Sequence, residues 1–532
     1  MTKTTKVFYY GEDQLSAGLA LEIARGQRKG LIGEKAAERI HASQMAVNDI
    51  VARKETVYGI NTGFGPLCTT VISPEDTQKL QYNILKSHSA GVGQPIPAEI
   101  AQLMMVLKVH ALARGYSGIA RSTLERIIWH IENNVTPVVP SQGSVGASGD
   151  LAPLAHLFLP LIGLGKVYYR REGTKQIVCT DAAHVLTKKG LKPLELGPKE
   201  GLALINGTQF IAAFAIKGLE RLLNCLDTAD IIGAMTLESL LGSIKPFKTE
   251  LHQLRPYIGT TYVAHRMRNL LAGSAMVESH TDCSRVQDPY SLRCMPQVHG
   301  ASRTAWLHLK DILNTELNSV TDNPIILDTH NSISGGNFHG QPMALPLDYA
   351  TVAAAELGNI SDRRTYLLLE GNVEGLPVLL MKNIGINSGF MIPQYTSAAL
   401  VSENKCLCFP ASADSIPTSL GQEDHVSMGS ISARKLNTVI DNLENILAVE
   451  LVTAAQAFDF RRPLKSSQIL ESCHNLVRKK IDHTDEDRIF AADLQVARDL
   501  IASKALAKLS NQVAETGKID LLGEHGKLFD IY

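Results

Sequence analysis

Long helical patterns fill the second half of the chain and limit its fold more than any other feature. From Glu200 onward, apolar residues recur at helical spacing without regular strand alternation, and Gly and Pro fall mainly between the patterns. The sequence has neither a strand–helix–strand alternation nor a repeat of fixed period, which argues against Rossmann and TIM-barrel folds. The patterns predict helices within residues 200–226, 236–244, 302–317, 347–369, 398–408 and 427–458.

Several of these patterns are longer than a usual globular helix and apolar over much of their surface. A helix that is apolar on several sides must be buried on several sides. We therefore predict a mainly α-helical protein with a central bundle of long helices, and a large subunit interface that covers the remaining apolar faces. We expect a loop-rich N-terminal region over residues 1–115 and a helical domain over residues 116–532, ending in charged C-terminal helices.

The first half mixes shorter helical patterns with glycine-rich turns. Ser73, followed by a proline and two acidic residues, predicts the start of a helix. That helix runs out near His88, at the mouth of a glycine-rich turn. Apolar stripes predict two more helices, within residues 100–111 and 124–131, and residues 166–194 suggest a short surface hairpin.

Charge and cysteine usage exclude several classes of function. The net charge of −1 and pI of about 7.0 offer no electrostatic footprint for nucleic acid or an anionic membrane. The apolar run after Asp150 is broken by prolines and is too short to span a bilayer. The eight cysteines are scattered without metal-ligand spacing, so we expect reduced thiols and no metal site. With no apolar signal segment near the N-terminus, we predict a cytoplasmic protein.

Glycines at three-residue spacing mark the stretch from Gly143 to Asp150. The spacing does not match a dinucleotide-binding loop, a P-loop or a nucleophile elbow. A flexible loop before a helix is one interpretation. The other is self-cyclisation of Ala147-Ser148-Gly149, in which the unhindered Gly149 nitrogen attacks the Ala147 carbonyl. Loss of two waters would give a 4-methylidene-imidazol-5-one (MIO), an electrophile made from the chain itself.

Polar segments interrupt the apolar background at several further places. Each has a structural interpretation as a helix cap, a buried hydrogen-bonded pair or a solvated face. For Arg293 the structural interpretation is an ion pair, because a buried arginine usually has a carboxylate partner. So many segments in one chain are hard to explain by packing alone. They are the glycine-rich loop with Tyr58 (57–67), Asn206-Gly-Thr-Gln209, the run with Gln287, Tyr290 and Arg293, Asp322-Asn-Pro324, the glycine-rich 334–340 and the acidic 418–425.

Together these segments resemble the MIO-dependent aromatic amino-acid lyases, in the family's order from about Glu55 to Asp459. The segment from Gly143 to His156 is similar to the family's cofactor-forming segment. The resemblance implies a long-helix bundle of the histidine/phenylalanine ammonia-lyase type. It also implies a homotetramer in which each active site takes residues from three subunits. No external cofactor is implied.

The resemblance also implies roles for the site residues. An MIO formed by Ala147, Ser148 and Gly149 would capture the substrate's α-amine, since no ordinary side chain is an electrophile. Tyr58 would take the β-proton as general base, with a pKa lowered by nearby helix N-termini. The remaining assignments are Arg293 for the substrate carboxylate, Asn206 and Tyr290 near the cofactor and amino group, and Gln287 and Phe338 as pocket lining.

The substrate follows from two further segments. Ser87-His88 and Gln422-Glu423 match positions that histidine enzymes of the family use, and a carboxylate suits an imidazole N–H. We therefore predict elimination of ammonia from L-histidine to give trans-urocanate, the first step of histidine degradation. Tyrosine or phenylalanine ammonia-lyase or aminomutase activity on the same scaffold is the alternative, followed by a non-catalytic helical scaffold. Gly421 and Gln341 depart from the residues common in the histidine enzymes.

Overall fold

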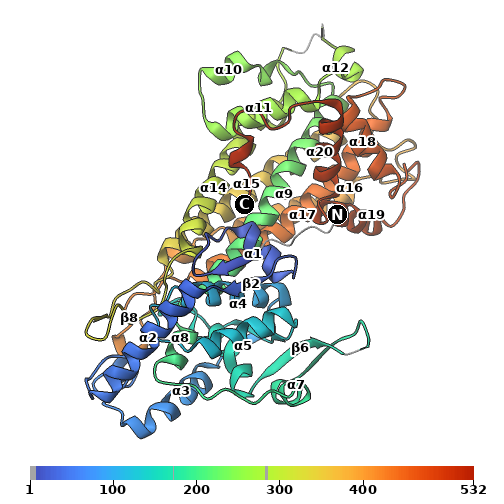
Figure 1. The fold of residues 1–532 in the computed structure, drawn as a ribbon. Coiled ribbons are helices and arrows are strands. Elements are labelled where there is room, and N and C mark those ends of the chain that lie inside the picture. Colours follow the sequence, from blue (N-terminus) through green and yellow to red (C-terminus); the bar gives the residue numbers. More distant parts are fainter. Residues whose placement is uncertain (1–6, 172, 282–285) are drawn as a thin grey trace.

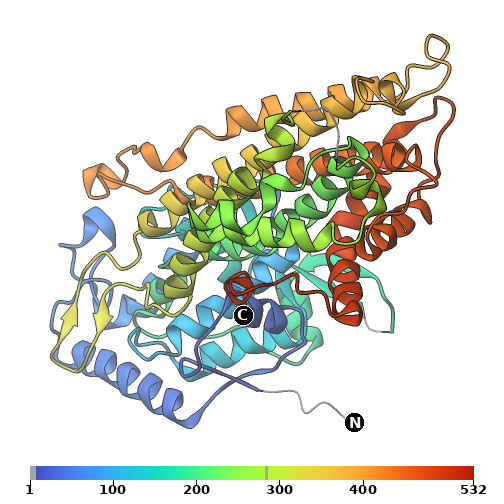
Figure 2. The same cartoon turned by 90° about the horizontal axis from the view of Figure 1, so that it is seen from above.

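The computed structural model describes residues 7–171, 173–281 and 286–532 and confirms a mainly α-helical fold. Long helices run from the N-terminal half at one end of the molecule to a group of short helices at the other (Figure 1). In the perpendicular view these long helices lie alongside one another (Figure 2). The central bundle consists of α9 (Gln209–Ser239), α14 (Met295–Leu317), α15 (Gln341–Leu369) and α17 (Gly429–Asp459).

The bundle explains the broad apolar surfaces seen in the sequence. Helix α17 packs against both α15 and α9, and α14 packs against α9, α15 and α11. Nearly every residue of α9 is buried, so apolar residues are needed all around it. The indole N–H buried in this interior is satisfied, because Trp306 donates to the Leu219 carbonyl at 2.8 Å.

One predicted helical pattern proves to be two helices. The expected helix over residues 200–226 is interrupted, because α8 (Glu200–Ile205) ends at Asn206 and α9 starts only at Gln209. Gly207 lies between them with a φ of +114°, a backbone conformation that L side chains rarely adopt. This break places Asn206 and Gly207 at the N-terminal end of α9, beside the glycine-rich stretch.

The N-terminal half contains the shorter elements. The predicted hairpin at residues 166–194 is present as an antiparallel pair that follows a short strand. A parallel pair joined through one helix, β1 with β2, was not expected from the sequence, since each strand is only three residues long. The helices are α1 (Ala17–Ala24), α2 (Glu34–Ala52), α3 (Pro74–His88), α4 (Ala98–Leu112), α5 (Arg121–Glu132), α6 (Leu151–Phe158) and α7 (Ala182–Lys188). The strands are β1 (Phe8–Tyr10), β2 (Gly30–Ile32), β3 (Val92–Pro95), β4 (Thr136–Pro137), β5 (Pro140–Gln142), β6 (Lys166–Arg170) and β7 (Ile177–Asp181).

Short helices and the C-terminal segment cover the other end and the flanks of the bundle. The C-terminal segment returns to the bundle, where Phe529 stacks on Tyr262 with ring centroids 4.4 Å apart. The remaining elements are α10 (Thr249–Gln253), α11 (Ile258–Leu270), α12 (Ala275–Glu278), α13 (Tyr290–Arg293), α16 (Met391–Leu407), α18 (Gln468–Arg478), α19 (Phe490–Ala502), α20 (Ala505–Gly517) and the pair β8 (Ile325–Ile326) and β9 (Ser332–Ile333).

One large apolar core contains residues from Phe8 to Phe529 and thus draws on both expected regions. The boundary between residues 115 and 116 stays a prediction. Over the described ranges, the helices are all too short or too polar to cross a membrane.

Candidate active site

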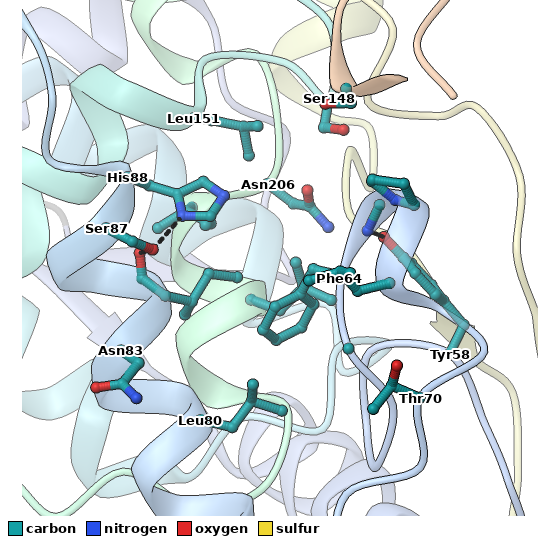
Figure 3. Close-up of a pocket in the computed structure, with 18 of the residues that line it drawn as sticks. Tyr58, Phe64, Thr70, Leu80, Asn83, Ser87, His88, Ser148, Leu151 and Asn206 are labelled. Atoms are coloured by element: carbon teal, nitrogen blue, oxygen red, sulfur yellow. Dashed lines mark hydrogen bonds between the residues drawn. The ribbon is translucent and has the colours of Figure 1, made fainter. Parts of the chain in front are cut away.

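Two adjoining cavities open beside the glycine-rich stretch, with volumes of about 560 and 640 Å³. Both are lined by Tyr58, Ser148, Asn206 and Glu423. Figure 3 shows Ser148, Asn206 and Tyr58 around the first cavity, with His88 at its side. Side chains from distant parts of the sequence thus converge on Ser148.

Backbone contacts hold the Ala147–Gly149 segment against the start of α9. The Gly207 N–H donates to the Ser148 carbonyl at 3.3 Å, and the Asp150 N–H donates to the Gly207 carbonyl at 2.8 Å. A Cβ added to Gly149 would lie 2.1 Å from the Gly207 carbonyl oxygen, and the φ of Gly149 is +75°. Only glycine fits such a close approach. The same feature leaves the Gly149 nitrogen unhindered.

Asp150 anchors this segment to α9 and was missed as a functional candidate. Its carboxylate, fully buried, accepts hydrogen bonds from the backbone N–H groups of Phe210 at 3.1 Å and Ile211 at 3.0 Å. A carboxylate is stabilised there because the first N–H groups of a helix lack intrahelical partners. Burial nevertheless raises the pKa of Asp150 to about 7. An acidic residue directly before an apolar helix was the available signal in the sequence.

Beneath the cavity lies a group of buried polar side chains. The Asn206 amide nitrogen donates to the Asn323 carbonyl at 2.8 Å and to Asp322 at 3.3 Å. Asp322 in turn forms an ion pair with the fully buried Lys199 at 2.5 Å. Lys108, from the apolar stripe of α4, donates to the Asn206 carbonyl. Lys108 was missed because it lies in a pattern that otherwise predicts only apolar packing. Lys199 was missed because it lies in a Gly-Pro turn before a helix, where a lysine is usually exposed.

Tyr58 lines both cavities, but the predicted lowering of its pKa is wrong. Burial raises the pKa of the phenol, and the negative charge of Glu423 raises it further. The Gly65 N–H, which donates to the phenol oxygen at 3.2 Å, only partly opposes the rise. The sequence suggested electropositive helix ends around Tyr58, whereas its surroundings in this chain are apolar and partly anionic.

Glu423 faces Ser148 across the cavity. The Ser148 hydroxyl donates to one Glu423 carboxylate oxygen at 3.1 Å, and the Thr418 and Ser419 hydroxyls donate to the other at 2.8 and 2.9 Å. The loop before it places Gly421 at a φ of +85°. Glycine is the residue that most readily adopts this conformation, so Gly421, which departs from the residue common in the histidine enzymes, fits this loop.

The other predicted substrate-binding residues of this region also line the cavities. His88, at the end of α3, lies 3.0 Å from the Ser87 hydroxyl through its Nδ1, and burial lowers its pKa. Phe338 and Gln422 line the larger cavity together with Tyr58. Gln341 is the second residue that differs from those common in the histidine enzymes. It donates to the Ser412 carbonyl at 3.2 Å and so contacts the adjacent loop.

Three predicted residues lie elsewhere in the chain. Gln287 lines a separate cavity with Ser243, beyond the C-terminal end of α9, and Ser243 is tied to Asp288 at 2.6 Å. Helix α9 has 31 residues and is therefore about 46 Å long, which separates the Gln287 cavity at its C-terminal end from Ser148 at its N-terminal end. Tyr290 and Arg293 belong to α13, where the guanidinium lies 4.5 Å from the tyrosine ring centroid. One chain thus does not bring these three residues to Ser148.

The residues present fit an MIO. Gly149 has the required backbone freedom, and its N–H donates no hydrogen bond within the described residues. The Ser148 hydroxyl, which ring formation would remove, lines the cavity. Within the part of the chain that the structure describes, no group of three or more His, Cys, Asp or Glu side chains is arranged to hold a metal ion.

The chain is similar to known proteins over most of its length. The family model for aromatic amino acid lyases matches residues 15–479. The chain is 46% identical to a histidine ammonia-lyase of Natranaerobius thermophilus over 91% of this chain and 95% of the relative, and 49% identical to one of Sorangium cellulosum over the same shares. Among solved structures, histidine ammonia-lyase from Trypanosoma cruzi superposes with a TM-score of 0.87 at 40% identity, covering 99% of this chain and 98% of that one. A tyrosine aminomutase from Streptomyces globisporus gives 0.89 at 32% identity, covering 95% and 99%.

Proposed function

This chain belongs to the aromatic amino acid lyase family, and from that premise we propose that it eliminates ammonia from L-histidine to give trans-urocanate. The relatives of nearly full length that bear the name histidine ammonia-lyase support this choice. The same family contains enzymes for larger aromatic side chains, so the substrate depends on the pocket.

One observation carries the proposal: Ser148 of the Ala-Ser-Gly tripeptide lies 3.1 Å from Glu423 in a cavity that also holds Tyr58 and His88. The cofactor-forming residue and an acidic recognition group therefore face the same space. A carboxylate beside an imidazole-binding space can accept one ring N–H. A phenyl ring offers no polar hydrogen, and a phenol offers an O–H donor but no ring N–H.

The cofactor is proposed to be an MIO formed from Ala147, Ser148 and Gly149, which supplies an electrophile that turns the substrate amine into a better leaving group. Tyr58 takes the β-proton, since its phenol lines the cavity beside Ser148. The side-chain amide nitrogen of Asn206 is held by Asp322 and Asn323, which leaves the side-chain oxygen Oδ1 for the cavity. That oxygen can accept from the substrate's ammonium group.

Recognition of the ring and of the carboxylate would come from different chains. Glu423 and His88 hold the imidazole within one subunit, with Gln422 and Phe338 as further lining. We infer a homotetramer in which neighbouring subunits bring Tyr290, Arg293 and Gln287 to complete the site. In support, Tyr290 is 70% exposed, and Arg293 forms no ion pair within the described residues, which leaves its guanidinium for a substrate carboxylate.

The scattered free thiols and the near-neutral charge fit a cytoplasmic location without nucleic-acid or membrane partners. These parts of the proposal rest on composition. Expression with fractionation of the native cells would test them.

The experiment offers purified protein L-histidine, L-tyrosine and L-phenylalanine in parallel and follows product absorbance, with the intact mass measured on the same sample. We expect urocanate as the main product and a mass two waters below that of the unmodified chain. Coumarate without urocanate would show that the substrate is tyrosine, the amino acid in the name of the aminomutase neighbour. A mass without water loss would contradict the cofactor proposal.

A further inference from the structure

A fully buried lysine lies behind the tripeptide and has no part in the reaction proposed above. Lys108 belongs to α4, whose residues from Ile100 to Leu112 are all buried, and it is 1% exposed. Its ammonium donates to the backbone carbonyl of Asn206; among the described residues it makes no other hydrogen bond and no ion pair. A buried ammonium usually contacts a carboxylate, because desolvating an unpaired charge is costly.

The carboxylates near Lys108 are engaged by other groups. Asp322 holds Lys199 at 2.5 Å, and Asp150 accepts the first N–H groups of α9. Burial lowers the pKa of Lys108 to about 7, and these two carboxylates oppose the shift without touching the ammonium. The chain thus directs a costly buried cation to a single peptide carbonyl.

That peptide group connects Lys108 to Ser148. The Asn206–Gly207 peptide accepts from Lys108 at its carbonyl, and its N–H donates to the Ser148 carbonyl at 3.3 Å. A cation at the carbonyl end of a peptide polarises the group and strengthens its N–H as a donor. The positive charge of Lys108 therefore acts on the Ser148 carbonyl through one rigid peptide.

The Ser148 carbonyl matters for ring formation. A bond forms between the Gly149 nitrogen and the Ala147 carbonyl carbon, and that carbonyl oxygen leaves as water with the amide protons of Gly149 and Ser148. The second water takes the Ser148 hydroxyl and the proton on its Cα. The hydrogen bond from the Gly207 N–H to the Ser148 carbonyl stabilises the negative charge that develops there as the Cα proton leaves. It also holds the segment in the bent form that closure needs.

We propose that Lys108 is a positioning residue for cyclisation of Ala147-Ser148-Gly149, acting through the Asn206–Gly207 peptide on the Ser148 carbonyl. This inference rests on the proposed function, since it requires the tripeptide to cyclise. Lys108 does not touch the substrate or the reacting atoms. Its effect lies in how fast, and how completely, the chain loses two waters.

The test follows intact mass over time in freshly synthesised full-length chain. Lys108→Met keeps the length of the side chain and removes the ammonium, and we expect loss of two waters to slow by about tenfold or more, the effect of one charge-assisted hydrogen bond. The matched control is Gln102→Met. Gln102 lies in the same helix and is 4% exposed, but it donates to the Thr136 hydroxyl at 2.6 Å instead. The control should lose both waters at the wild-type rate.

Each outcome decides the matter. Slow water loss in a folded Lys108→Met chain, with a normal control, supports the role of Lys108. Water loss at the wild-type rate overturns it while leaving the proposed function intact, whereas a wild-type chain that loses no water contradicts the proposed function itself. If Lys108→Met does not fold, Lys108→Gln, which keeps a neutral donor, replaces it with the same criteria. Failure of both variants to fold also overturns the proposal, because Lys108 would then serve the core.

Discussion

Buried charge is held differently in the middle of the bundle and at the floor of the candidate site. In the bundle, the Arg364 guanidinium contacts both Glu450 oxygens, at 2.6 and 2.9 Å. Asp230 similarly holds Arg266 at 2.8 Å and Arg303 at 2.6 Å, and these neighbours keep the pKa of Asp230 far below its usual range. Carboxylates and guanidinium groups there are matched side chain to side chain.

At the floor of the site, beside the Lys199–Asp322 ion pair, two other buried charges have backbone groups as partners in place of an opposite charge. Asp150 relies on the N–H groups of Phe210 and Ile211, and Lys108 relies on the Asn206 carbonyl. The pKa values of both groups move toward neutrality, to about 7 in each case. Matched pairs favour their charged forms, whereas backbone partners only partly offset desolvation.

The difference shows what each region is built for. Removing one member of a buried ion pair strongly destabilises a fold, because the other charge stays buried without a partner. The ion pairs of the bundle therefore stabilise the fold. A charge that is held by a peptide group also fixes the position of that peptide. Lys108 holds the Asn206–Gly207 peptide, whose N–H contacts the Ser148 carbonyl, and Asp150 holds the first peptides of α9. We therefore expect bundle substitutions to change stability, and site substitutions to change cyclisation, turnover or pH dependence.

The largest effect expected is on turnover, from Tyr58→Phe. Loss of a general base should reduce histidine turnover by about 10²–10⁴-fold, with little change in unfolding. Because the pKa of Tyr58 is raised, its basic form accumulates only at high pH, so wild-type kcat/KM should fall steadily as pH decreases from about 10 toward about 7. Steady-state kinetics across this range measure it. A profile that stays level from neutral pH upward would mean that the assembled site ionises the phenol.

Glu450→Leu should have the largest effect on stability. The change leaves Arg364 buried without its carboxylate and should destabilise the fold by about 3–5 kcal/mol. Chains that still fold at low temperature should lose two waters normally. Urea unfolding and intact mass measure the two effects, and the double variant Arg364→Met with Glu450→Leu should recover much of the loss. Normal stability in Glu450→Leu would erase the distinction between the two regions.

Asp150→Asn should change how stability depends on pH. The folded carboxyl has a pKa raised from 3.8 to about 7, so between these values the folded chain holds a proton that the unfolded chain has released. Stability from this group is therefore lost as pH rises through that window, by at most about 1.4 kcal/mol per pH unit. Unfolding at several pH values should show a slope in wild type that is smaller in the variant. Equal slopes would assign the dependence to other groups.

The smallest effect expected is that of Glu423→Gln. The substitution keeps the shape but removes the charge that accepts an imidazole N–H, so histidine turnover should fall by about 10–100-fold. Cys406→Ala, at an exposed position of α16, is the control and should leave turnover unchanged. Parallel kinetics decide the matter, and equally small effects of both changes would remove Glu423 from substrate binding.

Local sequence patterns were enough to predict most of the long helices and several residues of the candidate site. Helical periodicity predicted the long helices, and Ser73 with the following proline predicted the start of α3. The spacing of small residues singled out Ala147-Ser148-Gly149, and ordered motifs pointed to Tyr58 and Glu423, which do line one site. These signals are short in sequence, since each depends on residues within a few turns of chain.

Tertiary structure alone decided what surrounds those residues. Lys108 and Asn206 lie 98 positions apart, and Ser148 and Glu423 lie 275 apart, so no local pattern could pair them. The same holds for the raised pKa of Tyr58, which depends on burial and on the charge of Glu423. The length of α9 likewise separates Arg293 and Gln287 from Ser148 within one chain. Burial and electrostatic environment arise from contacts between distant segments, and only the fold determines which segments meet.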